Sequence, residues 1–229
     1  MRTPAPRGRF TYLALGVASV TAFLACVLGG EGSITGTANV PACRLAGVYD
    51  LHATFFVNER TGRSITIRIQ DGGGTPEYTD HLYLQIDDTV EVARRLAAST
   101  TRDAEGRALV TMPVGQRADG VIVHALFEPT RSCGRTKASR LGINVGLWAY
   151  DGTVTFRGID RGDNEDAGPG APPGGETEVT DLRIRVHDPR PWGNPAPSGV
   201  SASDPVGDGE LHGWFHFPWR RGTPAQTFP

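Results

Sequence analysis

Hydrophobic and polar residues alternate with a period of two over several short stretches of the chain. In Ser64–Gln70, for example, Ile65, Ile67 and Ile69 fall on one side and polar residues on the other. Because successive side chains of a strand point to opposite faces, such stretches predict β-strands with one buried face. The other predicted strands are His81–Asp87, Leu141–Leu147, Asp181–His187, Val48–Val57, Ala108–Met112, Val121–Phe127, Thr153–Ile159 and Glu210–Phe217.

Turn and helix signals agree with a β-rich fold. Asp151-Gly152 lies between two predicted strands, which predicts a tight hairpin. Only Thr89–Ala98 has a convincing helical pattern, and Asp88 is the expected N-cap. The 30 Gly and 17 Pro residues favour turns and short strands over long helices. We therefore predict an all-β fold, an antiparallel β-sandwich or jelly-roll-like domain with one short helix.

The N-terminal segment has the pattern of an export signal. Residues 1–25 combine a basic start with an apolar run from position 10, as in a secretory signal peptide. Residues 23–26, with the sequence FLAC, then resemble the bacterial lipobox, in which Cys26 accepts the lipid. Two alternatives stay open. Because apolar residues continue to Leu28, the segment is also long enough for an uncleaved anchor, and ordinary signal peptidase would instead release a soluble protein.

The mature chain divides into two parts in this interpretation. Residues 26–40 are rich in Gly, Ser and Thr and predict a flexible tether. Residues 41–229 then form a single β-sandwich domain. Val27, rather than Asp, follows the lipidated cysteine, which by resemblance to Gram-negative lipoprotein sorting permits transfer to the outer membrane.

The cysteine count supports the lipoprotein interpretation. Of three cysteines, lipidation of Cys26 leaves Cys43 and Cys133 as one candidate disulfide. Exported proteins meet an oxidising environment in which an unpaired thiol is unusual. The bridge would close a loop of about 90 residues.

Composition and motifs argue against several function classes. The net charge is −2, Lys137 is the only lysine, and no basic cluster occurs, so nucleic acid is not an expected partner. The chain has no nucleophile elbow and no phosphate-binding glycine loop, so no catalytic residue is assigned. His212 and His216 alternate as in a strand, which would separate them by about 13 Å and prevent them from sharing a metal.

Two groups of residues remain as candidate binding sites. The acidic loop residues Asp160, Asp163, Glu165 and Asp166 supply oxygen ligands suited to calcium, although the EF-hand order is absent and a solvated loop is the alternative. The aromatic residues Trp148, Tyr150, Trp192 and Trp214 are candidates for a contact surface that binds a glycan or a protein. Burial of these rings in the sandwich is the alternative, and it is the one that we expect.

Several short segments resemble a known group of proteins. They are Gly32–Thr37, Ile67–Gln70, Asp188–Arg190, Gly213–Phe217 and Arg221–Pro229, and they are similar in kind to segments of uncharacterised lipoproteins of myxobacteria. The resemblance implies a lipoprotein of a Gram-negative envelope and implies no activity or catalytic residue.

Together these observations predict an exported protein, held at the outer membrane by an N-terminal lipid. Its expected role is non-enzymatic, as a structural or partner-binding β-domain with an envelope protein or glycan as partner. The alternative is a carbohydrate-active or calcium-dependent surface-binding protein.

Overall fold

The computed structural model describes residues 30–41, 44–72, 78–134, 145–159, 175–188 and 207–219. Within these residues the chain forms eleven strands and two helices. The strands are β1 Glu31–Val40, β2 Leu45–Leu51, β3 Phe55–Thr61, β4 Ser64–Gln70, β5 Asp80–Ile86, β6 Val110–Pro113, β7 Arg117–Ala118, β8 Val121–Pro129, β9 Leu147–Gly158, β10 Gly175–His187 and β11 Asp208–Trp219. The helices are α1 Thr89–Ala98 and α2 Thr130–Gly134. The predicted all-β fold is confirmed, and α2 is a second, very short helix that the sequence pattern did not indicate.

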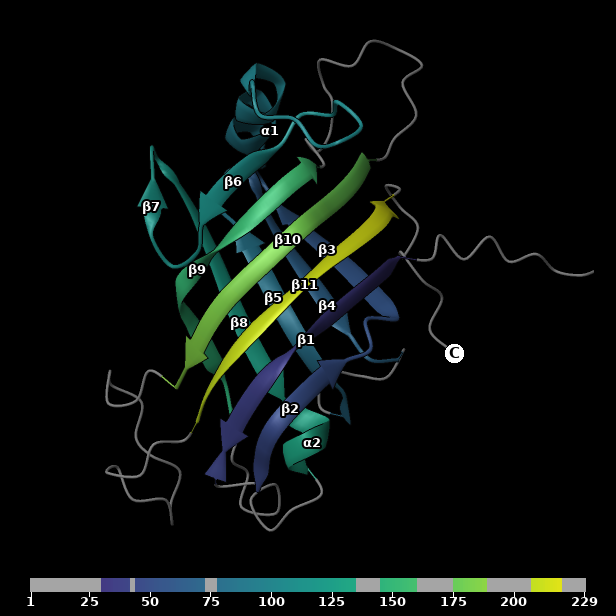
Figure 1. Ribbon diagram of the computed structural model, residues 1–229, viewed down its shortest axis with the longest axis vertical. Helices are drawn as coiled ribbons and strands as arrows, with labels where there is room; N and C mark the ends of the chain where they lie inside the picture. The colour runs from purple at the N-terminus through teal and green to yellow at the C-terminus, as the bar shows by residue number, and fades with distance from the viewer. Residues whose placement is uncertain are drawn as a thin grey trace, which may run out of the picture.

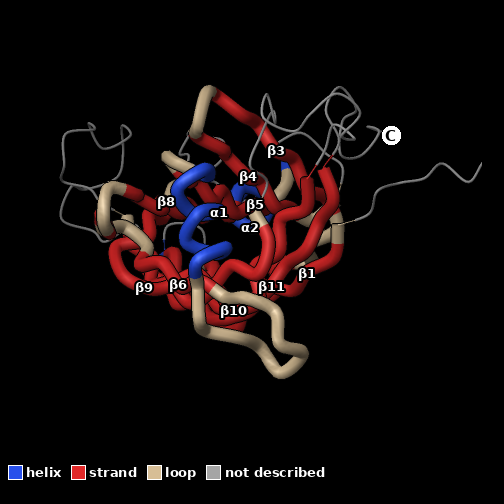
Figure 2. Tube along the Cα trace, turned by 90° about the horizontal axis from the view of Figure 1, so that it is seen from above, coloured by secondary structure: helices blue, strands red, loops and turns tan. Residues whose placement is uncertain are grey.

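The strands form one curled antiparallel sheet. Its order is β2-β1-β11-β10-β9-β8-β5-β4-β3, with β6 paired to β9 and β7 to β8. β8 and β9 pair at only two positions, Leu126 with Trp148 and Phe127 with Leu147, so the sheet turns sharply there. In Figure 1, β9, β10, β11 and β1 cross in front of β8, β5, β4 and β3. Figure 2, seen from above, shows the same sheet curling around its interior.

The hydrophobic core lies between these front and back halves of the sheet. Phe56 on β3 packs on Phe217 of β11 with ring centroids 5.5 Å apart, and Tyr49 on β2 meets Phe127 of β8 at 4.9 Å. Full burial of side chains of this size stabilises the fold by roughly 1.5–3 kcal/mol each. The core therefore joins strands that are far apart in the sheet order.

Alternation along the strands creates this core, as the sequence predicts. Ile65, Ile67 and Ile69 of β4 are fully buried, whereas the residues between them are partly exposed. Every second side chain of β8 is buried from Val121 to Pro129. The predicted limits of β4 agree with the structure at both ends.

The expected tether is wrong for residues 31–40, which form β1. This strand pairs with β11 on one side and β2 on the other. Ile34, Ala38 and Val40 point into the core, while Gly32 and Gly36 let β11 approach closely. Glycine therefore serves close strand packing here rather than flexibility.

The hairpin expected at Asp151-Gly152 is also wrong, because β9 runs straight through both residues. The register with β10 shifts between Ala149 and Asp151, which leaves Tyr150 as the extra residue of a β-bulge. Gly152 has φ +136°, and a Cβ there would lie 2.1 Å from the carbonyl oxygen of Arg183. The glycine thus permits a close approach inside a strand instead of a turn.

Other predicted strand limits also need correction. Val48–Val57 is not one strand, because residues 52–54 separate β2 from β3. Of Leu141–Leu147, the first four residues lie outside the described part, and β9 begins only at Leu147.

Helix α1 matches its predicted limits and its predicted N-cap. The side chain of Asp88 accepts a hydrogen bond of 2.9 Å from the Glu91 backbone N–H. Hydrogen bonds from Arg94 and Arg95 lower the pKa of Glu91 to about 2. Arg95 also donates to the carbonyl oxygen of Asp119, which ties the helix to the β7–β8 turn.

Candidate binding face on strands β9 to β11

The outer side of β9, β10 and β11 carries three of the four exposed large aromatic side chains in the described part of the chain, together with charged side chains. We call it the β9–β11 face and define it by the outward residues of 148–155, 181–187 and 208–214. Leu147, Leu182 and Phe215 are fully buried on the opposite side of these strands. Their outward neighbours therefore face solvent, since side chains alternate along a strand.

Aromatic rings occupy two ends of this face. At one end Trp148 and Tyr150 are 43% and 46% exposed, and Tyr150 stacks on His187 with ring centroids 4.5 Å apart. At the other end Trp214 on β11 is 43% exposed and pairs in register with Ser33 of β1. The expected burial of these three aromatic residues is wrong.

The distance between the two aromatic ends follows from the register. Trp148 lies opposite His187, which in turn lies opposite Asp208 on β11. Trp214 is six residues further along β11, which corresponds to about 20 Å along the strands. The face is therefore long enough for an extended ligand.

Charged residues from three strands fill the space between the rings. Arg185 lies between Asp151 of β9 and Glu210 of β11 in the register, and Arg183 lies beside His212. All five side chains point outward. Their alignment needs the bulge at residue 150, because without it Asp151 would point to the opposite side of the sheet.

Ion pairs hold the two arginines in place. Arg185 Nη2 is 2.5 Å from Asp151 Oδ2, and Arg183 Nε is 3.0 Å from Asp181 Oδ1. Both arginine side chains are more than half exposed, so the pairs add little to stability. A guanidinium has five N–H donors, so each arginine retains donors for a ligand after pairing.

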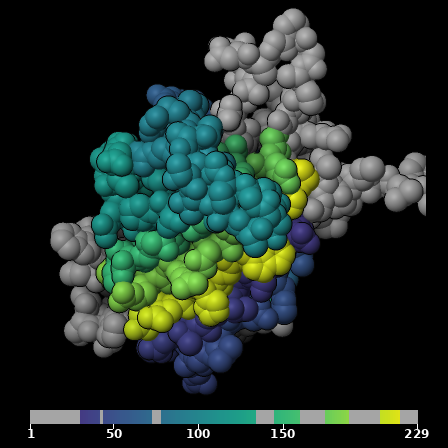
Figure 3. Space-filling model, turned by 45° about the horizontal axis from the view of Figure 1, so that its top comes forward, coloured from purple at the N-terminus to yellow at the C-terminus, as the bar shows by residue number. Residues whose placement is uncertain are grey.

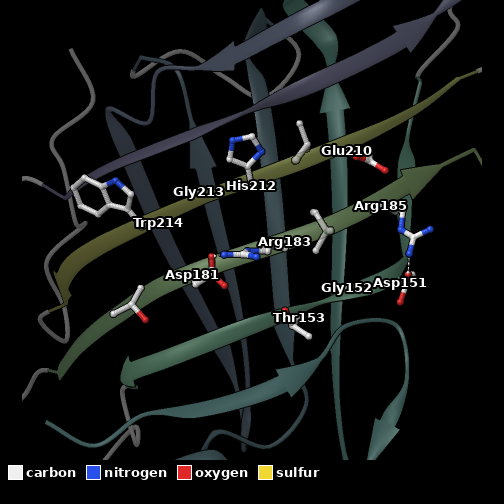
Figure 4. Close-up of a pocket in the computed structure, with 13 residues that line it drawn as sticks. Asp151, Gly152, Thr153, Asp181, Arg183, Arg185, Glu210, His212, Gly213 and Trp214 are labelled. Atoms are coloured by element: carbon white, nitrogen blue, oxygen red, sulfur yellow. Dashed lines mark hydrogen bonds and ion pairs between the residues drawn. The ribbon is translucent and has the colours of Figure 1, made fainter. Parts of the chain in front are cut away.

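These side chains line an open depression of about 620 Å³ (Figure 4). Its lining comes from residues 151–153 of β9, 180–185 of β10 and 210–214 of β11, with residue 182 excepted. Gly152 and Gly213 belong to the lining and contribute no side chain. In Figure 4, Trp214 lies at one end of the depression, and the Arg185–Asp151 pair lies at the other.

The connection between α1 and β6 lies beside the end of this face at which β10 begins. Arg157 Nη1 donates to Asp103 of that connection at 3.1 Å and also pairs with Glu178 of β10. Burial raises the pKa of Asp103, but hydrogen bonds from the Arg107 backbone N–H and Arg157 outweigh it and lower the pKa to about 2. In Figure 3 this connection, coloured teal, stands forward of the green and yellow strands. It limits the face on that side.

Other predicted site residues are only partly described. Cys26, Cys43, Trp192 and the calcium candidates Asp160, Asp163, Glu165 and Asp166 lie outside the described residues. Cys133 is buried in α2. His212 and His216 lie on β11 as predicted, with His216 bonded to Glu176. Within the described ranges, no three acidic, His or Cys side chains are placed to hold a metal.

A second polar cluster was not predicted from the sequence. Asp80 on β5 is 1% exposed and accepts a hydrogen bond of 2.9 Å from Tyr49 of β2. It also accepts hydrogen bonds from the backbone N–H and hydroxyl of Ser132 in α2. Next to it, buried His81 contacts Glu128 at 2.7 Å. The hydrogen bonds of Asp80 join β5 to β2 and to α2.

Comparisons with known proteins add no functional assignment. No family model, curated protein or solved structure matches the chain. Among the residues described, no helix is both long enough and apolar enough to cross a bilayer.

Proposed function

We propose that this chain is a lipid-anchored, non-enzymatic protein of the Gram-negative cell envelope that binds a partner through the β9–β11 face. The observation that carries the binding role is the exposure of Trp148, Tyr150 and Trp214 on one face of a folded domain. Exposed apolar surface that is gathered on one face and surrounded by polar residues often marks an interaction site. Trp, Tyr and Arg are also the residues that contribute most to binding energy in interfaces.

The anchor rests on the N-terminal sequence and on the resemblance to myxobacterial lipoproteins. β1 begins at Glu31, five residues after Cys26, and an extended chain of that length spans at most about 18 Å. Lipidation of Cys26 would therefore hold the β-domain close to the outer membrane. The Trp214 end of the face, which lies beside Ser33, would be nearer to the lipid than the Trp148 end.

The same proposal includes a Cys43–Cys133 disulfide. Its support is the oxidising compartment together with the burial of Cys133. Asp80 binds both Ser132, next to Cys133, and Tyr49 of β2, the strand that follows Cys43. The segments on both sides of the bridge therefore belong to one hydrogen-bonded cluster.

Intact mass spectrometry of the membrane fraction tests the anchor. We expect a mass that lacks residues 1–25 and includes acyl chains on Cys26, with two further hydrogens missing for the disulfide. A Cys26→Ser variant is the matched control, and its measured mass should lack the acyl chains. An unmodified Cys26 in the wild-type protein would refute the anchor.

Sedimentation with isolated cell envelopes tests the binding face. The full chain is kept in detergent micelles throughout, so that insertion of its lipid into a membrane adds nothing to the pellet. It should pellet with the detergent-insoluble fraction of envelopes that lack their own copy, and Trp148→Ala combined with Trp214→Ala should reduce the pelleted fraction severalfold. Tyr78→Ala removes a ring that is 76% exposed and lies outside the face. This variant should therefore pellet to the same extent as the wild-type protein. Equal pelleting of all three proteins would disprove the role of the face.

A further inference from the structure

We infer that the β9–β11 face binds a neutral oligosaccharide, extended along the strands from Trp214 toward Trp148. This inference rests on the proposed function, because it names the class of partner that the same face would bind. Four properties of the face support it: the placing of the rings, the kind of polar groups between them, their balance of charge, and the shape of the depression.

The rings are placed for two separate contacts with one extended molecule. Trp214 lies on β11, whereas Trp148 and Tyr150 lie on β9, about 20 Å away along the strand direction. One small ring system cannot reach both ends. A pyranose has an apolar face of C–H groups, so successive sugar units can stack on each aromatic end.

The polar groups between the rings suit sugar hydroxyls. A hydroxyl both donates and accepts, so it needs acceptors and donors side by side. Asp151, Asp181 and Glu210 supply carboxylate acceptors, and Arg183 and Arg185 supply N–H donors within the same depression. The ion pairs fix the guanidinium orientations in advance, which lowers the entropy lost when a ligand binds.

The balance of charge argues against a strongly charged ligand. Two arginines stand among three carboxylates, and Glu210 makes no ion pair within the described residues. A polyanion such as an acidic polysaccharide would meet these carboxylates, and a polycation would meet the arginines. A neutral chain avoids both repulsions.

The shape of the depression favours a chain rather than a compact molecule. Sites for small molecules usually enclose most of the ligand surface. Here the 620 Å³ depression is open, because its walls are side chains of a single sheet layer. A linear oligosaccharide can enter from the side along the open length of the depression.

A glycan array, followed by titration calorimetry, tests this inference. The array carries neutral oligosaccharides, including chitohexaose, cellohexaose and maltohexaose, with heparin and polygalacturonate fragments as acidic ligands. The full chain in detergent should bind at least one neutral ligand saturably and the acidic ligands weakly. Trp214→Ala and, separately, Trp148→Ala should each weaken binding at least about tenfold. Tyr78→Ala should leave the affinity unchanged, and Trp214→Phe should restore part of it.

The opposite results separate this inference from the proposed function. Binding to acidic ligands alone, or to no glycan on the array, would overturn the oligosaccharide inference. If the double aromatic variant still lost envelope binding in that case, the face would bind a different class of partner and the proposed function would stand. If envelope binding were also unchanged, both would fail. Circular dichroism of each variant confirms that the fold is intact before affinities are compared.

Discussion

Replacing Asp80 by alanine is expected to lower the free energy of unfolding by roughly 3–5 kcal/mol. The carboxylate is buried and accepts hydrogen bonds from Tyr49 and from the backbone and side chain of Ser132. Its removal leaves these donors in the interior without an acceptor, and it also loosens the contact of β2 and α2 with β5. Urea unfolding of wild-type and variant protein, followed by circular dichroism, measures the difference.

Two variants make this prediction specific. Asp181→Ala removes a carboxylate that is 43% exposed and paired with an exposed arginine, so it should cost less than about 1 kcal/mol. Asp80→Asn retains one acceptor oxygen and should fall between wild type and Asp80→Ala. A loss below about 1 kcal/mol for Asp80→Ala would contradict the role of Asp80 as the link between these segments.

The same cluster should make the fold sensitive to alkaline pH. Burial, followed by the negative charge of Asp80 and the hydrogen bond to it, raises the pKa of Tyr49 above its ordinary value of 10.0. The folded state therefore keeps a proton that the unfolded chain releases near pH 10. Stability from this hydroxyl is complete below pH 10 and is lost as the pH rises further. Tyr49→Phe should reduce the pH dependence in that range.

Replacing Gly213 by alanine is expected to destabilise the fold by at least about 3 kcal/mol. A Cβ at this position would lie 2.0 Å from the carbonyl oxygen of Ser33 and 2.8 Å from Cα of Ile34. Both atoms are backbone atoms of β1, so no side chain can rotate away. β1 must then move from β11, and β2, which pairs only with β1 in the described sheet, moves with it.

Gly158→Ala is the matched control for Gly213→Ala. It is also a strand glycine, but its Cβ would meet its nearest neighbours at 3.4–3.6 Å, which is ordinary contact. We expect a change within about 0.5 kcal/mol, because alanine also reduces the entropy of the unfolded chain. Equal destabilisation by both substitutions would show that close approach to β1 is not the cause.

The β9–β11 face shows how far the sequence could lead. Alternation from Leu147 puts Trp148 and Tyr150 on the side opposite Leu147, and both are exposed there in the structure. The period-two pattern does not show whether that side faces solvent or another layer, because both faces of a strand in a sandwich can be covered. The expected turn at Asp151-Gly152 also concealed the alignment of Asp151 with Arg185, which exists only in a continuous, bulged β9.

The sequence alone predicted those elements that depend on residues close together in the chain. The alternating isoleucines of β4 and the cap and limits of α1 follow from strand alternation and from the unpaired N–H groups of a helix start. Tertiary structure decided the rest. Glycines at 36, 152 and 213 look like flexible or turn residues, but the close approach of a distant strand gives them their role. The face and the Asp80 cluster likewise arise from long-range strand pairing, which residue order alone does not specify.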